Sequence, residues 1–143
     1  MKYFLLLSIT LFTLSVSGQE NAIFSTKAGA IKGYDPVAYF TVGEPIKGDS
    51  EQKLEWSGAT WYFSSQENKD LFEANPEAYA PQYGGYCAYG VAKGGLYKIE
   101  PEAWSIIDGK LYLNYNLKLQ KEWEEDIPGY VTEANKNWPG LIK

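Results

Sequence analysis

The residues best suited to chemistry lie within one stretch, Pro81 to Gly90 (PQYGGYCAYG). It holds the only cysteine of the chain, Cys87, shortly after the pair Gly84-Gly85. Because glycines permit positive φ and close approach of other groups to the backbone, we expect a bend that fixes the position of Cys87. Three tyrosines accompany it, and each has an apolar ring and a hydroxyl that needs a partner when buried: Tyr83, Tyr86 and Tyr89. The stretch predicts a tyrosine-lined pocket around a thiol.

Cys87 itself has three candidate roles. In the simplest, it is an inert side chain in a structural domain, because free cysteines are among the most buried residues. In the second, backbone N–H groups at the first turn of a helix lower its pKa. The thiolate then serves a redox enzyme through a sulfenic acid or a mixed disulfide with a thiol partner. In the third, the surrounding pocket holds a small molecule or a metal ion. The sequence leaves these roles open.

A second stretch is predicted to contribute to the same pocket. Asp35 precedes Pro36, a pair typical of a helix start, so we expect its carboxylate to cap a helix. The alternative is that Asp35 faces Cys87 across a cleft, as a hard metal ligand or a proton acceptor. The predicted metal ligands are therefore Cys87 and Asp35. The predicted ligand-binding residues are Tyr34, Asp35, Tyr83, Gly84, Gly85, Tyr86 and Tyr89.

Composition argues against several classes of function. The 143 residues carry a net charge of −5, include no His, and have Lys as their only basic residue type. Without His, a Ser or Cys nucleophile lacks its usual general base, and neither a Gly-x-Ser-x-Gly motif nor a phosphate loop is present. An acidic chain without Arg is not expected to bind nucleic acid. The acidic run Glu122 to Asp126 has the spacing of a solvated helix face and lacks a calcium-loop pattern.

Residues 1–18 are predicted to be a signal peptide. Lys2 precedes an apolar run from Tyr3 to Val16, and small residues surround an expected cleavage after Gly18. The run is short for a membrane span, so we expect an exported protein, periplasmic or secreted, with no transmembrane segment after cleavage. The alternative is that the run is retained as a signal anchor. A single cysteine in an oxidising compartment cannot form an intrachain disulfide. It is then buried, a free thiol, or a link between the chains of a homodimer.

Two hairpins are expected to organise the mature chain. β-prone segments at 54–56 and 60–64 flank the turn sequence Ser57-Gly58-Ala59. Segments at 104–107 and 110–114 flank Asp108-Gly109, a strong hairpin signal because both residue types accept positive φ. Residues 41–49 are expected to form a loop, and residues 19–30 a polar lead-in segment without periodicity.

Short helices are expected around these hairpins. One turn is predicted at 36–40 and another at 76–79, each beginning with Pro. Between them, Ser65 is predicted to cap a helix whose inward face is Leu71 and Phe72. Helices interleaved with hairpins, without a βαβ period, predict an α+β fold: a small antiparallel sheet of two hairpins with short flanking helices.

The C-terminal part is expected to hold two more helices. The first begins at Asn116, presents the apolar stripe Leu119, Trp123 and Ile127, and is expected to end at Pro128-Gly129. The second is predicted to run from Tyr130 to Trp138 and to end before Pro139.

Three motifs make the chain resemble the YHS domain family, specifically its exported bacterial branch. They are GYDPVAYF at 33–40, the segment 61–79 that begins WYFSS and ends NPEAY, and the bend PQYGGYCAYG. The resemblance spans about residues 31–139. Residues 31–140 are therefore predicted to be one YHS-like domain.

The resemblance implies a fold similar to small treble-clef metal-binding modules (TRASH-like domains). In those relatives cysteine ligands stand where this chain has Ala38, Ser64 and Asn68. One Cys and no His cannot supply the four thiolate or imidazole ligands of a structural zinc site, so this chain departs from that pattern. The resemblance to exported relatives also implies redox or nucleophilic chemistry, because selenocysteine can stand there at the position of Cys87.

The first hypothesis is thus an exported YHS-like domain that binds a small ligand or a metal ion in a pocket around Cys87, with a second chain able to contribute. The alternatives are a thiol-dependent redox enzyme that uses Cys87 and a structural domain in which the thiol is inert.

Overall fold

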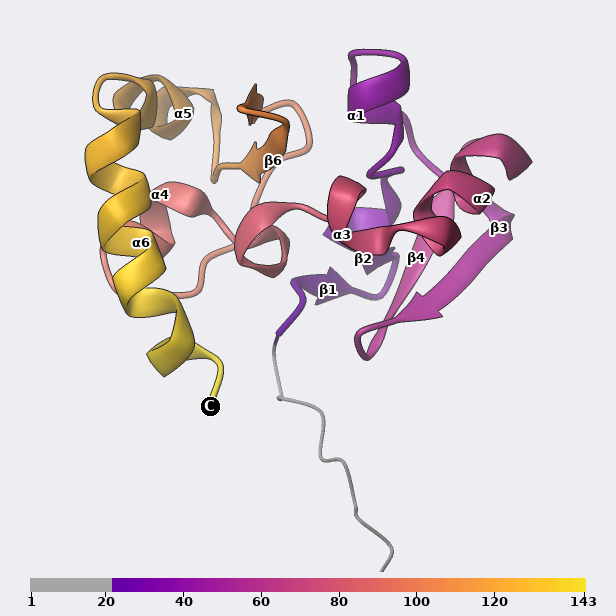
Figure 1. Cartoon of the computed structure of the whole chain (residues 1–143), viewed down its shortest axis with the longest axis horizontal. Helices are drawn as coiled ribbons and strands as arrows, with labels where there is room; N and C mark the ends of the chain where they lie inside the picture. The colour runs from indigo at the N-terminus through magenta and orange to yellow at the C-terminus, as the bar shows by residue number, and fades with distance from the viewer. Residues whose placement is uncertain (1–21) are drawn as a thin grey trace, which may run out of the picture.

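A computed structural model describes residues 22–143, and it has the predicted α+β fold (Figure 1). The predicted signal peptide lies outside the described residues. Strands pair as three separate antiparallel hairpins: β1 (Ser25–Thr26) with β2 (Gly29–Ala30), β3 (Asp49–Trp56) with β4 (Ala59–Phe63), and β5 (Trp104–Ile107) with β6 (Lys110–Leu113). The α-helices are α1 (Ala38–Thr41), α2 (Gln66–Ala74), α3 (Pro76–Tyr79), α4 (Ala88–Ala92), α5 (Leu117–Glu124) and α6 (Ile127–Leu141).

Both predicted hairpins are confirmed, because their turn chemistry is local. Ser57 and Gly58 have φ of 52° and 77°, and Asp108 and Gly109 have φ of 52° and 75°. Two successive residues with positive φ make the turn whose twist matches that of paired strands. Strand β3 is longer than predicted and begins at Asp49, where a loop was expected. Its extra residues are polar. Of these, Asp49 pairs with Phe63 and Lys53 with Tyr62, and the register shifts between Asp49 and Lys53.

A third hairpin lies in the lead-in segment, where the sequence had shown no periodicity. Strands β1 and β2 are two residues each, too short to leave a pattern. The segment is held to the rest of the fold by backbone contacts. The amide of Phe24 donates to the carbonyl of Gly84 at 2.9 Å, and that of Ile31 donates to the carbonyl of Phe24 at 2.9 Å. The lead-in segment thus contacts the glycine bend directly.

Helix α2 begins and ends as predicted but presents a narrower inward face. The Ser65 hydroxyl accepts from the Asn68 amide at 3.1 Å, and the helix ends before Pro76. Phe72 is fully buried, whereas the Leu71 side chain is 41% exposed. The predicted inward position of Leu71 is therefore wrong. The buried residues of α2 are Phe72 and the polar Asn68, so the inward face does not extend to Leu71.

The two C-terminal helices divide at a different place from the one predicted. Asn116 caps α5 as expected, with its Oδ1 accepting from the Leu119 amide at 2.8 Å. Pro128 does not end this helix. It lies in the first turn of α6, where its missing N–H costs nothing, and the Asp126 carboxylate caps that turn. Helix α6 also continues through Pro139 to Leu141, so the prediction of a short helix ending at Trp138 is wrong.

Two apolar clusters fill the interior. The first is centred on β4 and α2 and includes Trp61, Phe63 and Phe72. The second lies between the bend, β6 and the C-terminal helices and includes Tyr112 and Trp123. In Figure 1 the helices α4, α5 and α6 stand at the left of the view, and β3, β4 and α2 at the right. Cys87 belongs to the first cluster and Ala88 to the second, so the thiol lies where the two clusters meet.

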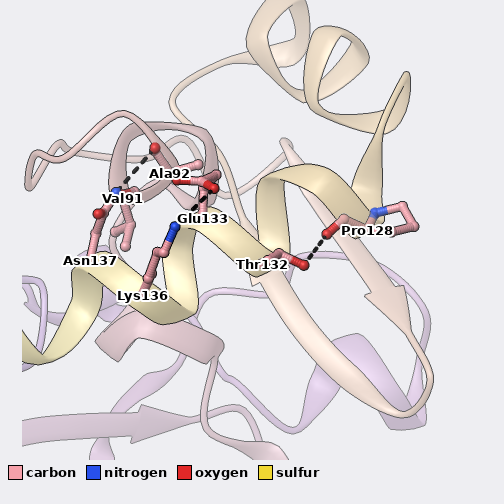
Figure 2. Close-up of polar contacts among 7 residues, drawn as sticks. All are labelled: Val91, Ala92, Pro128, Thr132, Glu133, Lys136 and Asn137. Atoms are coloured by element: carbon pink, nitrogen blue, oxygen red, sulfur yellow. Dashed lines mark hydrogen bonds and ion pairs between the residues drawn. The ribbon is translucent and has the colours of Figure 1, made fainter.

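Helices α4 and α6 are joined by side-chain contacts from α6 (Figure 2). The Asn137 amide nitrogen donates to the carbonyls of Val91 and Ala92, at 2.9 and 3.1 Å. These carbonyls lie at the end of α4, where intrahelical partners run out. The Val91 carbonyl also accepts from the Gly94 amide at 3.0 Å. Lys136 pairs with Glu133 on the exposed side of α6 at 3.6 Å. The long C-terminal helix therefore holds α4, and with it the residue that begins α4, in place.

None of the helices within residues 22–143 combines the length and the apolar composition needed to cross a bilayer.

Candidate ligand pocket around Cys87

The glycine bend places Cys87 at the start of α4. Tyr83, Gly84 and Gly85 have φ of 57°, 61° and 86°, so the chain turns through three consecutive left-handed residues. Cys87 then serves as the N-terminal cap of α4, because its Sγ accepts from the Gly90 amide at 3.3 Å. A second amide, that of Tyr115, donates to the same sulfur at 3.2 Å.

Asn114 lies directly beside the sulfur and completes its polar surroundings. The thiol donates to Asn114 Oδ1 at 3.6 Å, and the Tyr89 amide donates to the same oxygen at 2.9 Å. These two donors fix which end of the amide group faces Cys87. The Asn114 side chain is fully buried, and its Nδ2 has no hydrogen-bond partner among the described residues. A buried donor without a partner is rare in folded proteins.

Burial and hydrogen bonding act on the thiol in opposite directions. Desolvation raises the pKa of Cys87, and the amides of Gly90, Tyr115 and Tyr89 lower it. Desolvation is the larger effect, so the pKa of Cys87 lies above its ordinary value. At neutral pH the side chain is a protonated thiol that donates to Asn114. The two amides that donate to the sulfur would still stabilise negative charge on it.

A cavity of about 420 Å³ opens beside this sulfur, and we call it the Cys87 pocket. Its lining is mostly apolar and aromatic, with a single cationic side chain. The Tyr97 side chain is 52% exposed, so this wall reaches the surface. The lining residues are Cys87, Tyr89, Gly90, Lys93, Tyr97, Tyr115 and Leu119.

Of the eight predicted site residues, Cys87 and Tyr89 line this pocket. The glycines shape the bend instead. A side chain at Gly84 would overlap the backbone of Ala22, and one at Gly85 would meet Ile31. The other two tyrosines of the bend pack in the second cluster. Tyr83 donates to Asn135 Oδ1 at 2.9 Å, and the Tyr86 ring lies against Phe24 and Trp138.

Asp35 lies away from the pocket, at the N-terminus of α1. Its Oδ1 accepts from the amides of Val37 and Ala38, at 2.8 and 3.2 Å, so the predicted helix cap is present. Its Oδ2 accepts from the Ser64 amide and hydroxyl, both at 2.7 Å, and from Asn68 Nδ2 at 2.8 Å. The carboxylate is fully buried. Tyr34 precedes it in the chain, and the backbone of Tyr34 forms an isolated antiparallel β-bridge with that of Lys47.

Five of the residues that line the pocket were not predicted from the sequence: Gly90, Lys93, Tyr97, Tyr115 and Leu119. They come from α4, from the loop after it, from the segment between β6 and α5, and from α5. No motif connects them, because they meet only when the β5–β6 hairpin brings residue 115 back to residue 87. One signal was available. Asn114 is a polar residue at the end of an apolar strand, and a polar side chain there often marks a site.

The donor set does not fit a soft metal ion held by one chain. Residues 22–143 contain no group of three or more His, Cys, Asp or Glu side chains placed to hold a metal. Ser64 and Asn68, which stand where the resemblance implies cysteine ligands, donate hydrogen bonds to Asp35 instead. Hydroxyl and amide groups that already serve a carboxylate are poor ligands for zinc or copper.

Comparisons with known proteins add one finding. The model of the YHS domain family matches residues 37–83. The matched segment contains α1, β3, β4 and α2, together with Ser64 and Asn68, and it ends before Cys87. Neither the curated proteins nor the solved structures gave a match.

Proposed function

We propose that this chain is an exported binding module, because residues 37–83 match the model of the YHS domain family, which is compatible with metal or ligand binding. Its ligand is a small organic molecule held in the Cys87 pocket. The observation that carries the proposal is the cavity of about 420 Å³ with aromatic walls beside the only thiol of the chain. Pockets of this kind, mostly apolar with a few polar groups, are typical of small-molecule sites.

The state of the thiol favours binding over redox chemistry. A reactive cysteine needs a thiolate at neutral pH, and desolvation raises the pKa of Cys87. The sulfur also accepts hydrogen bonds from two backbone amides, and the thiol proton is donated to Asn114. A redox cycle would in addition need a resolving thiol from another molecule. The same two amides could stabilise a thiolate, which keeps the redox enzyme as the second candidate.

A metal ion is the third candidate, and it would need ligands from a second chain. Cys87 supplies one thiolate, and the pocket lining contains no other soft donor. Metal retained by the purified mature protein after dialysis against a chelator would favour this candidate over an organic ligand.

The neutral dye N-phenyl-1-naphthylamine tests the pocket, because its fluorescence rises in an apolar cavity. We expect it to bind the mature protein and to lose binding in Leu119→Trp, where the larger side chain occupies the cavity. The matched control is Leu71→Trp, at an exposed position on α2, which should bind the dye as the wild type does. Circular dichroism verifies that both variants fold. Absence of dye binding, or equal binding by both variants, would contradict the proposal.

Alkylation of the native protein separates the two leading candidates. Iodoacetamide at pH 7 should modify Cys87 much more slowly in the folded protein than in urea, because the thiol is buried and protonated. Modification as fast as in the unfolded chain would favour the redox enzyme.

A further inference from the structure

We infer that the Cys87 pocket selects a small aromatic molecule that carries a carboxylate. The inference rests on the proposed function and names the class of ligand. It is drawn from the shape of the pocket walls and from the distribution of charge around them.

The walls fit a flat ring. Tyr89, Tyr97 and Tyr115 face one cavity, and Leu119 adds an aliphatic surface. The ring of Tyr97 lies so close to Gly90 and Gly95 that a Cβ at either glycine would collide with it. The backbone therefore holds this wall in position. A volume of about 420 Å³ is near the lower end for organic ligands, which suits one or two fused rings. Aromatic pairs in offset or edge contact add stabilisation beyond burial.

The charge around the pocket favours an anion. Lys93 is in the lining, whereas no Asp or Glu is, although acids outnumber lysines by 18 to 13 in the whole chain. The Lys93 ammonium lies 5.4 Å from the centre of the Tyr89 ring and 5.6 Å from that of Tyr130. It forms no ion pair with a carboxylate of the described residues. Lys98 adds a second positive charge, 5.1 Å from the centre of the Tyr115 ring.

The acidic groups near Lys93 are not part of the lining of the Cys87 pocket. Lys93 also borders a neighbouring cavity, whose lining includes Asp126 and Glu133. The carboxylate of Glu122 accepts from the Tyr89 hydroxyl at 3.1 Å and is absent from the lining of the Cys87 pocket. The only charged side chain that lines the Cys87 pocket among the described residues is therefore the Lys93 ammonium.

A cationic ligand is the strongest competitor, because tyrosine cages also bind quaternary ammonium groups. In this chain the rings of Tyr89 and Tyr115 each already face a lysine ammonium. A second cation at these rings would be repelled by the first. The same lysines attract a carboxylate, and a charge-assisted hydrogen bond from Lys93 would orient it at the mouth of the pocket.

Three indole compounds of nearly equal size test the inference: indole-3-acetate, indole-3-acetamide and tryptamine. Calorimetry on the mature protein should show that the acetate binds about tenfold more tightly than the neutral acetamide, as expected for one charge-assisted hydrogen bond. Tryptamine should bind more weakly than either. In Lys93→Gln the acetate and the acetamide should bind with equal affinity. The control Lys136→Gln removes a lysine that pairs with Glu133 on α6 and should keep the tenfold difference.

The outcomes distinguish this inference from the proposed function. Equal binding of acetate and acetamide by the wild type, or tightest binding of tryptamine, would overturn the carboxylate assignment. If none of the three binds while N-phenyl-1-naphthylamine still does, the assigned ligand class is wrong, but the Cys87 pocket still binds small molecules as proposed. If the neutral dye also fails to bind, the proposed function itself falls.

Discussion

Asp35 is the clearest case of a residue whose role as a helix cap could be predicted from the sequence, although most of its hydrogen-bond partners could not. The pair Asp35-Pro36 predicted a helix cap, and Oδ1 makes that cap. Nothing local predicted that Oδ2 would accept three further hydrogen bonds from Ser64 and Asn68. Those residues follow about 30 positions later, and their meeting depends on how β4 and α2 pack on α1. A fully buried carboxylate without a cationic partner is stabilised here by five donors alone.

Replacing this carboxylate should be costly. In Asp35→Asn an amide NH₂ takes the place of one oxygen and faces donors, so the free energy of unfolding should fall by about 3 kcal/mol. Urea denaturation followed by tryptophan fluorescence measures the loss. Asp70→Asn is the matched control, because Asp70 is exposed and accepts only from Gln66. Similar losses in the two variants would show that the buried donors can be satisfied without the carboxylate.

At the scale of single elements, turns were predicted better than helix ends. Asp108-Gly109 and Ser57-Gly58 determine their hairpins through the φ values that those residues accept, which is a local property. Pro128 and Pro139 were interpreted as helix ends, yet both lie inside α6. A proline in the first turn loses no hydrogen bond, and whether a later proline ends a helix depends on what the helix packs against. Helix α6 packs against α4 and the glycine bend, and these contacts are not visible in the local sequence around Pro139.

The contact between α4 and α6 leads to a second prediction. Asn137→Ala removes two hydrogen bonds to the last carbonyls of α4 and should lower the free energy of unfolding by about 1 to 2 kcal/mol. Lys136→Ala, the adjacent change in Figure 2, removes only an exposed ion pair and should alter it by less than about 0.5 kcal/mol. Thermal unfolding of the two variants compares them. Equal effects would mean that solvent replaces Asn137 at the end of α4.

At the scale of the whole molecule, the sequence predicted the α+β class and the position of Cys87 in a bend before a helix. It did not predict the pocket walls. The walls come from segments between residues 89 and 119, and the β5–β6 hairpin brings them together. Long-range closure of this kind leaves little trace in composition or periodicity. The same closure buries several groups that ionise only at high pH, and these groups lead to a prediction for the entire fold.

Stability should fall in alkaline solution. Burial raises the pKa values of Cys87, Tyr39, Tyr83 and Tyr112 in the folded state. The unfolded chain loses these protons first, near pH 8.5 for Cys and pH 10 for Tyr, so rising pH favours unfolding. The stabilising contribution is complete below about pH 8 and is lost progressively above it. Urea midpoints measured from pH 7 to pH 11 should decline in two stages. Cys87→Ala should lack the first stage, and a decline that is unchanged in this variant would contradict the assignment.

The five hydrogen bonds of Asp35 also have a consequence for how the molecule opens. The amides of Val37, Ala38 and Ser64 donate to one carboxylate, so none can be exposed to solvent without releasing a charged group from its remaining donors. Their deuterium uptake should therefore show one common protection factor, set by the opening of the whole α1–β4–α2 unit. Fraying of the short helix α1 alone would not expose them.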